Sequence, residues 1–400
     1  MSAASPVAPA TASPARLGGI DALRGIVIVL MALDHCRDYY SSFPYRPTDL
    51  SQADWTLFLT RWVTHFCAPV FVLLAGSSAW LHREAAGLSR AELQRFLLTR
   101  GLWILLLEVS WNNFMWRFAL DGLSLQVLWA LGGAMVALSA LLWLPRGAII
   151  AVGAVLLLGH NLLDGVEAKA LGSEWSPAAL AWYLLHEPHV GRLGNGFELA
   201  ISYPLLPWIG VMALGYGLGA VFTAPAAERE RTLFRLGLLL TLGFVLLRLG
   251  NLYGEPQAWT DNPRGALYTA LGWLNLSKYP PSLHYLLMTL GPALMLLSRL
   301  DRWRGPVAEL FIGYGRVPMF FYLLHLPLIH AGSVLARYLL FGPAAFEAAS
   351  PQAALPSAYV PSLLPVYGAW LLVLALLHPA CRWYGGYKRR HREQRWLSYL

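Results

Sequence analysis

Charged residues are scarce in this chain of 400 residues. Asp, Glu, Lys and Arg make up 13% of the sequence and hydrophobic residues make up 57%, whereas a soluble domain carries about 25% charged residues. Long apolar stretches recur from residue 22 almost to the C-terminus, without the alternation of apolar and polar positions that marks a transmembrane β-strand. The composition therefore excludes a soluble globular protein and predicts an all-α, polytopic transmembrane helical bundle.

Cysteine is also scarce. Cys36, Cys67 and Cys381 are too few for a disulfide framework and have no zinc-site spacing, so we expect no bound metal. A single bridge between Cys36 and Cys67, across the first helical hairpin, stays open as an alternative. Residues 1–15 carry no charge at all and are rich in Ala, Ser and Pro, which predicts a disordered N-terminal tail. They lack the basic start of a secretory signal, so the first span is expected to be an uncleaved anchor.

Several segments are long and apolar enough to cross a membrane, since a span needs about 20 mostly apolar residues. We count ten, at roughly 20–39, 61–82, 97–117, 124–144, 147–163, 200–222, 232–252, 282–300, 307–330 and 362–384. They predict one transmembrane domain over 16–384, followed by a basic tail over 385–400. The sequence shows no internal repeat, which argues against an inverted-repeat transporter.

The net charge of +8 is unevenly distributed. The loops 83–96 and 223–231, the stretch 299–304 and the C-terminal tail are rich in Arg and Lys, and the count of ten spans places them all on one side. Positive residues favour the cytoplasm, so both termini are expected inside, with the protein in the inner (plasma) membrane. A basic tail can bind nucleic acid, but contact with anionic membrane lipid is the favoured interpretation, and no nucleic-acid partner is expected.

Histidines concentrate on the opposite, outer side. Eight of the eleven fall at outer ends of spans or in outer loops, namely His35, His65, His160, His186, His189, His284, His325 and His330. This distribution indicates a polar, proton-handling cavity that opens outward. The alternative is that the outer loops are simply longer and that histidine tolerates the membrane interface.

The first expected span ends in four ionisable residues. The stretch "ALRGIVIVLMALDHCRDYY", residues 22–40, is nearly apolar until Asp34, His35, Arg37 and Asp38. Asp38 follows His35 by three residues and shares its helical face, so it can fix the imidazole tautomer and raise the basicity of the other nitrogen. Asp34 and Arg37 are candidate substrate contacts, and His65 on the second span is a second candidate base. The alternative is a set of charges that ends the helix in water.

Two ion pairs are expected inside the bundle. Asp21 and Arg24 lie three residues apart at the inner end of the first span. Glu108 and Arg316 lie near the middle of the third and ninth expected spans, where a lone charge costs roughly 2.5–3.5 kcal/mol on insertion scales. We therefore predict that Glu108 and Arg316 pair with each other. The alternative is that each meets carbonyls, tyrosines or water separately.

Further polar residues are candidates for substrate contact. Asn112 and Asn113, in the outer half of the third span, can donate to a developing oxyanion or can hold helices together. His186, with His189, lies in the loop 164–198, and an outer loop of this length is often functional. His284 and His325 lie at outer ends of their spans.

Five stretches in order resemble a known family. They are "RLGGIDALRGIVIVLMALDHCRDYY", "RWVTHFCAPVFVLLAGSSAW", "SYPLLPWIGVMALGYGLG", "KYPPSLHYLLMTLGP" and "GRVPMFFYLLHLPL". They are similar to the membrane acyltransferases related to heparan-α-glucosaminide N-acetyltransferase, in particular a large bacterial branch of unknown function. The resemblance covers residues 16–341.

The resemblance implies transfer of an acetyl group from cytosolic acetyl-CoA, without a metal, to an amine across the membrane. In the lysosomal enzyme the catalytic histidine lies in the first non-cytosolic loop, and an asparagine ends the preceding helix. Here His35 stands at the helix end and no histidine lies between His35 and His65. His35, oriented by Asp38, is therefore the expected base, with His65 second.

The sequence therefore predicts a membrane acyltransferase. Acyl-CoA would be the donor, the acceptor would be an amine or hydroxyl, for example of a glycan, at the outer face, and a homodimer is possible. A transporter or permease for a small anion or sugar would use the same polar cavity without chemistry. A non-catalytic scaffold would not need His and Asp concentrated on one side.

Overall fold

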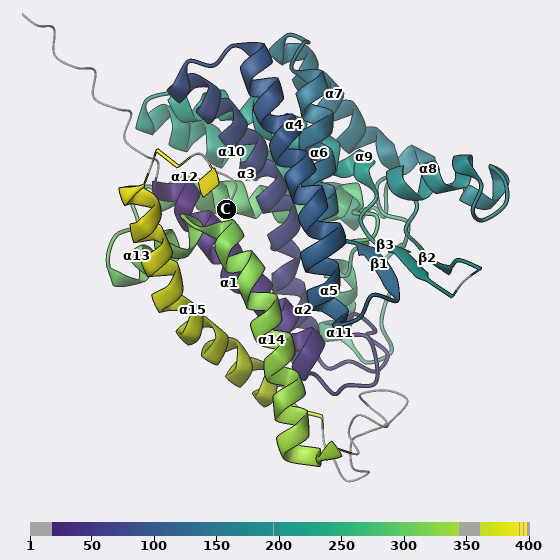
Figure 1. Ribbon diagram of the computed structural model, residues 1–400. Helices are drawn as coiled ribbons and strands as arrows, with labels where there is room; N and C mark the ends of the chain where they lie inside the picture. Colours follow the sequence, from purple (N-terminus) through teal and green to yellow (C-terminus); the bar gives the residue numbers. More distant parts are fainter. Residues whose placement is uncertain (1–17, 195, 344–360, 392, 395, 398–400) are drawn as a thin grey trace, which may run out of the picture.

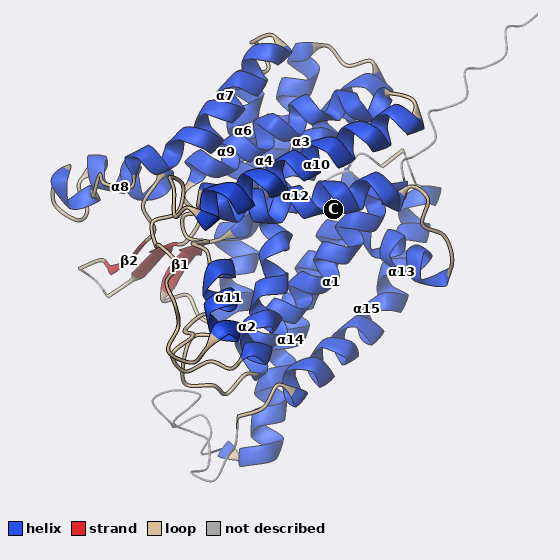
Figure 2. Cartoon of the chain, turned by 180° about the vertical axis from the view of Figure 1, so that it is seen from behind, coloured by secondary structure: helices blue, strands red, loops and turns tan. Residues whose placement is uncertain are grey.

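The computed structural model describes residues 18–194, 196–343, 361–391, 393–394 and 396–397. The tail expected at 1–15 lies outside these residues. In the described part, helices form a bundle in which α1 lies among several neighbours (Figure 1), and the few strands sit together at its edge (Figure 2). The expected all-α, polytopic helical architecture is confirmed.

The first half of the described chain contains nine α-helices, which are α1 (Gly18–Tyr40), α2 (Trp55–Trp62), α3 (Cys67–Ala86), α4 (Arg90–Leu107), α5 (Asn113–Arg117), α6 (Val127–Leu141), α7 (Arg146–Gly159), α8 (Pro177–Leu185) and α9 (Leu205–Leu218). The second half contains α10 (Ala226–Leu249), α11 (Ala266–Leu274), α12 (Leu283–Leu300), α13 (Pro306–Gly315), α14 (Pro318–Phe341) and α15 (Leu364–Arg390). Short 3₁₀ turns are η1 (Val63–Phe66), η3 (His160–Leu163), η4 (Ala168–Ala170) and η5 (Gly219–Thr223), and η2 (Glu108–Asn112) is a π-turn between α4 and α5.

Seven helical stretches in the described part are long and apolar enough to cross a membrane, namely Trp55–Ala86, Arg146–Leu163, Leu205–Thr223, Ala226–Leu249, Leu283–Leu300, Pro318–Phe341 and Leu364–Arg390. The spans expected at 20–39, 97–117 and 124–144 coincide with α1, with α4 to α5, and with α6. Of these, α6 has 15 residues, and α1 and the α4 segment carry several charged side chains.

The expected span 307–330 is wrong, because two helices replace it. Helix α13 ends at Gly315 and α14 begins at Pro318, with Val317 between them at φ −131° and ψ 49°. Proline has no N–H to donate and disfavours helical geometry in the residue before it, so a helix cannot run through this point unbroken. Arg316 therefore lies at the end of α13, 3.8 Å from Asp21 near the beginning of α1, and not in the middle of a continuous span.

Glycines allow α13 to lie directly against α1. A Cβ atom added to Gly25 would lie 1.8 Å from the Phe311 carbonyl oxygen, and one added to Gly315 would lie 1.8 Å from the Asp21 carbonyl oxygen. Small residues permit this backbone approach where two membrane helices cross. Gly25 and Gly315 thus fix the position of α13 beside the inner half of α1.

We expect Gly25→Ala to destabilise the protein, because the added methyl group has no space and forces the two backbones apart. Overpacking of this kind costs about 1–3 kcal/mol. Gly313→Ala is the matched control, because a Cβ atom there meets no heavy atom within 4 Å. Thermal unfolding in detergent measures both variants, and equal melting temperatures would contradict the close approach of α1 and α13.

The inner ends of several helices meet around one aspartate. Asp301, at the end of α12, accepts a hydrogen bond from the Gly19 amide (2.8 Å) and pairs with Arg229 of α10 (2.8 Å). Helix α15 continues to Arg390, so the predicted boundary at 384 falls inside it. Its last turn contains Lys388, Arg389 and Arg390, which suits the partial negative charge of a helix C-terminus.

A small sheet of three strands lies at the edge of the helical bundle. It contains β1 (Gly122–Leu125), β2 (His189–Arg192) and β3 (Glu198–Ile201) in the order β1-β3-β2, with β1 parallel and β2 antiparallel to β3. Asn113 anchors β1 to α5, because its amide donates to the Gly122 carbonyl (2.8 Å) and its carbonyl accepts from the Ser124 amide (3.0 Å). The carboxamide of Asn113 therefore holds β1 against α5.

Candidate functional site

Two histidines from opposite ends of the sequence form a hydrogen-bonded pair. The His35 Nδ1 and His325 Nε2 atoms lie 2.6 Å apart, and both rings are buried. His325 Nδ1 lies 2.5 Å from the Tyr322 carbonyl oxygen. A carbonyl only accepts, so Nδ1 of His325 carries the proton and its Nε2 accepts from His35 Nδ1. His35 Nε2 then keeps its lone pair, as a general base requires.

Asp38 does not orient His35, so that prediction is wrong. The Asp38 carboxylate accepts instead from the Arg37 guanidinium at 2.7 Å. His325, expected only as a substrate contact, occupies the orienting position. The two residues are 290 positions apart, and α14 brings His325 against α1.

Beside the histidine pair, a buried carboxylate binds two guanidinium groups. Asp34 accepts from Arg37 at 2.9 Å and from Arg61 of α2 at 2.7 Å. The Asp34 and Arg61 side chains are each 12% exposed. Arg61 lies in the last turn of α2, and its neighbours in the sequence do not indicate Asp34 as its partner.

His65 lies near this cluster with its imidazole largely unsatisfied. Its ring is buried, packs edge-on against Tyr285 with the centroids 5.3 Å apart, and has no hydrogen-bond partner at Nδ1 in the described part of the chain. The Tyr285 hydroxyl donates to the His65 backbone carbonyl at 2.7 Å. His65 therefore remains available to a ligand in the adjoining cavity.

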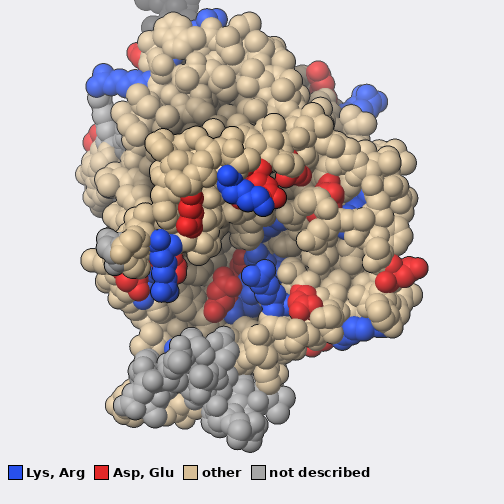
Figure 3. All heavy atoms as spheres, turned by 90° about the vertical axis from the view of Figure 1, so that its right-hand side faces the viewer, with Lys and Arg blue, Asp and Glu red and all other residues tan. Residues whose placement is uncertain are grey.

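That adjoining space, the outer cavity, has a volume of ≈ 870 Å³ and a polar lining. Its wall includes the cations Arg37, Arg46, Arg61 and Lys278, together with His65, His189, Tyr279, Asp49 and Glu255. Burial raises the pKa of Glu255, which weakens the negative contribution to the cavity. Figure 3 views the molecule from the side of the sheet and α8 and shows basic and acidic side chains gathered around a hollow, with other charged side chains scattered over the surrounding surface.

A second space, the inner cavity, has a volume of ≈ 480 Å³ and lies among α1, α3, α4, α6 and α14. Most of its wall is apolar. Four cations also line it, which we name the inner cations: Arg24, Arg100, Arg316 and Lys388. Met31 and Tyr322 belong to its wall as well.

The histidine pair lies between the two cavities. Met31 precedes His35 by one helical turn and lines the inner cavity, whereas Arg37 follows His35 and lines the outer one. Tyr322, also in the inner wall, precedes His325 by three residues on α14. His35 and His325 themselves are in the wall of neither cavity, but these helical neighbours connect the pair to both.

The predicted pair between Glu108 and Arg316 is wrong. Glu108 is fully buried and accepts from the Gln126 amide and from Asn112 Nδ2 (2.9 Å). Asn112 in turn accepts from the Tyr322 hydroxyl (3.4 Å), so its carboxamide holds helices together. Arg316 lies 3.8 Å from Asp21 instead. The reason is the break before Pro318, which places Arg316 beside the beginning of α1.

The remaining predicted residues have local roles. Asp21 and Arg24 form the expected pair at 3.5 Å. His186 lies 3.2 Å from Asp164; burial opposes ionisation of Asp164, but hydrogen bonds from His186 and Asn161 outweigh it and lower its pKa. His284 Nε2 contacts the Tyr253 carbonyl oxygen at 3.1 Å.

Neither His186 nor His284 lines the inner or the outer cavity. Cys36 and Cys67 are free thiols, so the alternative bridge is not formed. The Cys67 thiol instead donates to the Val27 carbonyl at 3.2 Å.

Comparison with known proteins finds one family. The model described as "Heparan-alpha-glucosaminide N-acetyltransferase, catalytic" matches residues 16–248, which is more than half of the chain and includes α1 to α9 and nearly all of α10. No curated protein matches the sequence. His35, Arg37, Arg61 and His65 lie inside the matched region, whereas His325 lies beyond it.

Proposed function

Since the chain belongs to the heparan-α-glucosaminide N-acetyltransferase catalytic family of membrane acyltransferases, we propose that it moves an acyl group, for example acetyl, across the membrane. The donor is an acyl-CoA that enters from the cytoplasm. The acceptor is an amine or hydroxyl, for example of a glycan, at the outer face of the inner membrane. The observation that carries this proposal is the buried His35–His325 pair, whose helical neighbours Met31 and Arg37 line the inner and the outer cavity.

The inner cavity suits the donor. The inner cations match the phosphates of coenzyme A, and the apolar wall beyond them matches the pantetheine arm and a short acyl chain. Arg24 and His35 are eleven residues apart on α1, which corresponds to about 16 Å along a helix at 1.5 Å per residue. An extended pantetheine arm covers such a length, so the thioester carbon can reach the histidine pair.

In the reaction, His35 Nε2 takes a proton from the acceptor amine or hydroxyl as that nitrogen or oxygen attacks the thioester carbonyl. The new N–C or O–C bond forms, the C–S bond breaks, and coenzyme A leaves as a thiolate that takes up the proton held at His35 Nε2. The hydrogen bond from His35 Nδ1 to His325 stabilises the imidazolium that forms.

Release of free thiol from acetyl-CoA by the purified protein, in the presence of a panel of amino sugars, tests the proposal. Product formation must depend on both the CoA thioester and an acceptor. Absence of thiol release with every acceptor and with acetyl-, propionyl- and butyryl-CoA would contradict an acyltransferase.

A transporter is the second candidate, because two cavities on either side of a buried polar barrier also suit alternating access. The same preparation discriminates the two functions once it is reconstituted in vesicles. A transporter moves a sugar or anion into the vesicle without releasing thiol, whereas the proposed enzyme releases one thiol for each acceptor modified.

We expect Arg100→Gln to raise the KM for acetyl-CoA roughly tenfold or more, because a hydrogen bond to a charged group contributes about 1.5–3 kcal/mol. The kcat should change little, since Arg100 contacts the donor far from the thioester. Arg95→Gln is the matched control: it lies on the same helix but is exposed and does not line the inner cavity. Steady-state kinetics measure the KM of both variants. Equal KM values for Arg100→Gln and Arg95→Gln would show that Arg100 does not contact the donor.

We also expect both termini, and the loops near residues 90, 145, 228 and 303, in the cytoplasm, because Arg and Lys concentrate there. Reporter fusions that are active only inside or only outside the cell measure this. Outside activity of fusions at residue 90 or 395 would reverse the orientation and exchange the donor and acceptor sides.

A further inference from the structure

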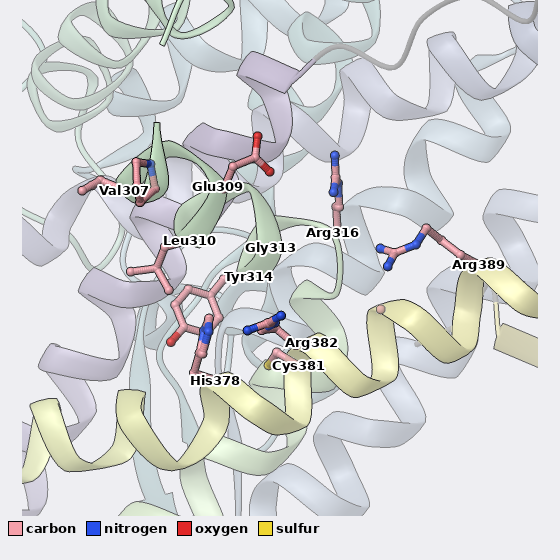
Figure 4. Close-up of a pocket in the computed structure, with 12 residues that line it drawn as sticks. Val307, Glu309, Leu310, Gly313, Tyr314, Arg316, His378, Cys381, Arg382 and Arg389 are labelled. Carbon is pink, nitrogen blue, oxygen red and sulfur yellow. The ribbon is translucent and has the colours of Figure 1, made fainter. Parts of the chain in front are cut away.

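A third cavity, of ≈ 680 Å³, lies between α13 and α15 and shares only Arg316 with the inner cavity. Its wall includes the apolar residues Val307 and Leu310 and the three arginines Arg316, Arg382 and Arg389. Figure 4 shows Arg316 on the α13 side of the gap and Arg382 and Arg389 on the α15 side. We name it the α13–α15 cavity.

Its arginines carry more charge than their surroundings neutralise. Arg382 and Arg389 are exposed and have no acidic partner within the described residues. Glu309 also lines the cavity, and Arg316, with its side chain 39% exposed, lies 3.8 Å from Asp21. The lining thus contains three guanidinium groups against one carboxylate.

The position of the cavity matches the membrane interface. Helix α15 ends at Arg390, and α13 begins just after the inner loop that contains Arg302 and Arg304. Arg382 and Arg389 are seven residues apart, or about 10 Å along the helix axis. Trp383, beside Arg382, is exposed, and exposed tryptophans are enriched where a span meets the headgroups.

The apolar part of the wall faces outward from the bundle. Val307 and Leu310 of α13 are exposed, and so are Leu371, Leu372 and Leu376, which lie earlier on α15. These side chains indicate that the outer surfaces of both helices face acyl chains. The cavity therefore combines guanidinium groups at the level of the headgroups with an apolar wall that is continuous with the lipid-facing surface.

We propose that the α13–α15 cavity binds one anionic phospholipid from the inner leaflet. Its phosphate lies against Arg382 and Arg389, and one acyl chain follows Val307 and Leu310. A free phosphate or nucleotide would make no use of the apolar wall, and a zwitterionic lipid would bring its own cation to the arginines. The bound lipid fixes α15 against α13 at the inner surface and so stabilises the bundle.

The experiment compares the purified wild type with the variant R382Q/R389Q and with the matched control R231Q/R235Q. The control removes the same charge from two exposed, inner-side arginines of α10 that line none of the three cavities. Each delipidated protein is titrated with phosphatidylglycerol, phosphatidylcholine or inorganic pyrophosphate. Thermal unfolding in detergent and mass spectrometry of retained lipid give the affinity and the number of lipids bound.

We expect phosphatidylglycerol to raise the melting temperature of the wild type and the control. R382Q/R389Q should bind it roughly 30-fold more weakly, given the usual contribution of each arginine near an anionic headgroup. The proposal would be overturned if R382Q/R389Q bound phosphatidylglycerol as tightly as the wild type does, or if R231Q/R235Q lost as much affinity as R382Q/R389Q. It would also be overturned if the wild type bound phosphatidylcholine as tightly as phosphatidylglycerol. Pyrophosphate binding that R382Q/R389Q abolishes would identify a free-phosphate site instead.

The KM for acetyl-CoA keeps this inference separate from the proposed function. It should be unchanged in R382Q/R389Q, because neither arginine lines the inner cavity. A KM raised tenfold in this variant would assign the arginines to the donor and overturn the lipid site. Should the protein release no thiol at all, the lipid titration still stands or fails on its own.

Discussion

His35→Ala is expected to lower the turnover number by roughly 100-fold or more, because general-base assistance is typically of that size. The KM for acetyl-CoA should change little, since the inner cations, which we propose bind the phosphates, remain in place. The alanine variant loses the nitrogen that accepts the proton of the acceptor, and it also leaves His325 Nε2 without its partner at 2.6 Å. Thiol release under saturating donor and acceptor measures the effect.

His284→Gln is the control for this prediction. It replaces another buried histidine of an outer helix end, retains a side-chain N–H donor toward the Tyr253 carbonyl, and lies outside both cavities. It should keep nearly full activity. If His35→Ala were fully active and His65→Ala inactive, the base would be His65. If both were active, the reaction would proceed without either imidazole.

The partner of His35 could not be predicted from the sequence, because helical spacing describes neighbours on one helix only. The three-residue spacing correctly places Asp38 near the face of His35, but Arg37 competes for that carboxylate and holds it at 2.7 Å. His325 reaches His35 through the packing of α14 against α1, and 290 intervening residues separate them. The sequence shows His325 two residues before Pro327 on an otherwise apolar helix. It does not show that His325 contacts His35.

Hydropathy predicted the helical class and most spans, since long apolar segments dominate the chain. It failed at 307–330, where apolar residues continue through Arg316, Val317 and Pro318 although the backbone does not continue as one helix. Because of this error, Arg316 was predicted to lie at mid-membrane depth, and Glu108 was predicted to be its partner. Glu108 instead receives hydrogen bonds from its own π-turn and from the chain entering α6, which a linear pattern does not encode.

Asp34→Asn is expected to cost about 3–5 kcal/mol of stability, because it leaves the buried guanidinium of Arg61 without a carboxylate. Arg61→Met should cost less, since Asp34 keeps its contact with Arg37 at 2.9 Å. The double variant Asp34→Asn/Arg61→Met should lose less than the sum of the two single losses, because it leaves neither group buried without the other. Thermal unfolding in detergent at several salt concentrations measures the stability of the wild type, the two single variants and the double variant, which together form a double-mutant cycle.

The matched control is Glu230→Gln, which breaks the ion pair with Arg302 at the inner surface. The Arg302 side chain is 66% exposed, so this loss should be at most about 1 kcal/mol and should shrink further in high salt. The loss from Asp34→Asn should persist at high salt, because ions do not reach a pair whose side chains are 12% exposed. Strictly additive losses around the cycle, or a salt dependence like that of Glu230→Gln, would show that water reaches Asp34 and that the pair does not hold α1 to α2. The outer cavity would then extend inward past Arg61, toward the histidine pair itself.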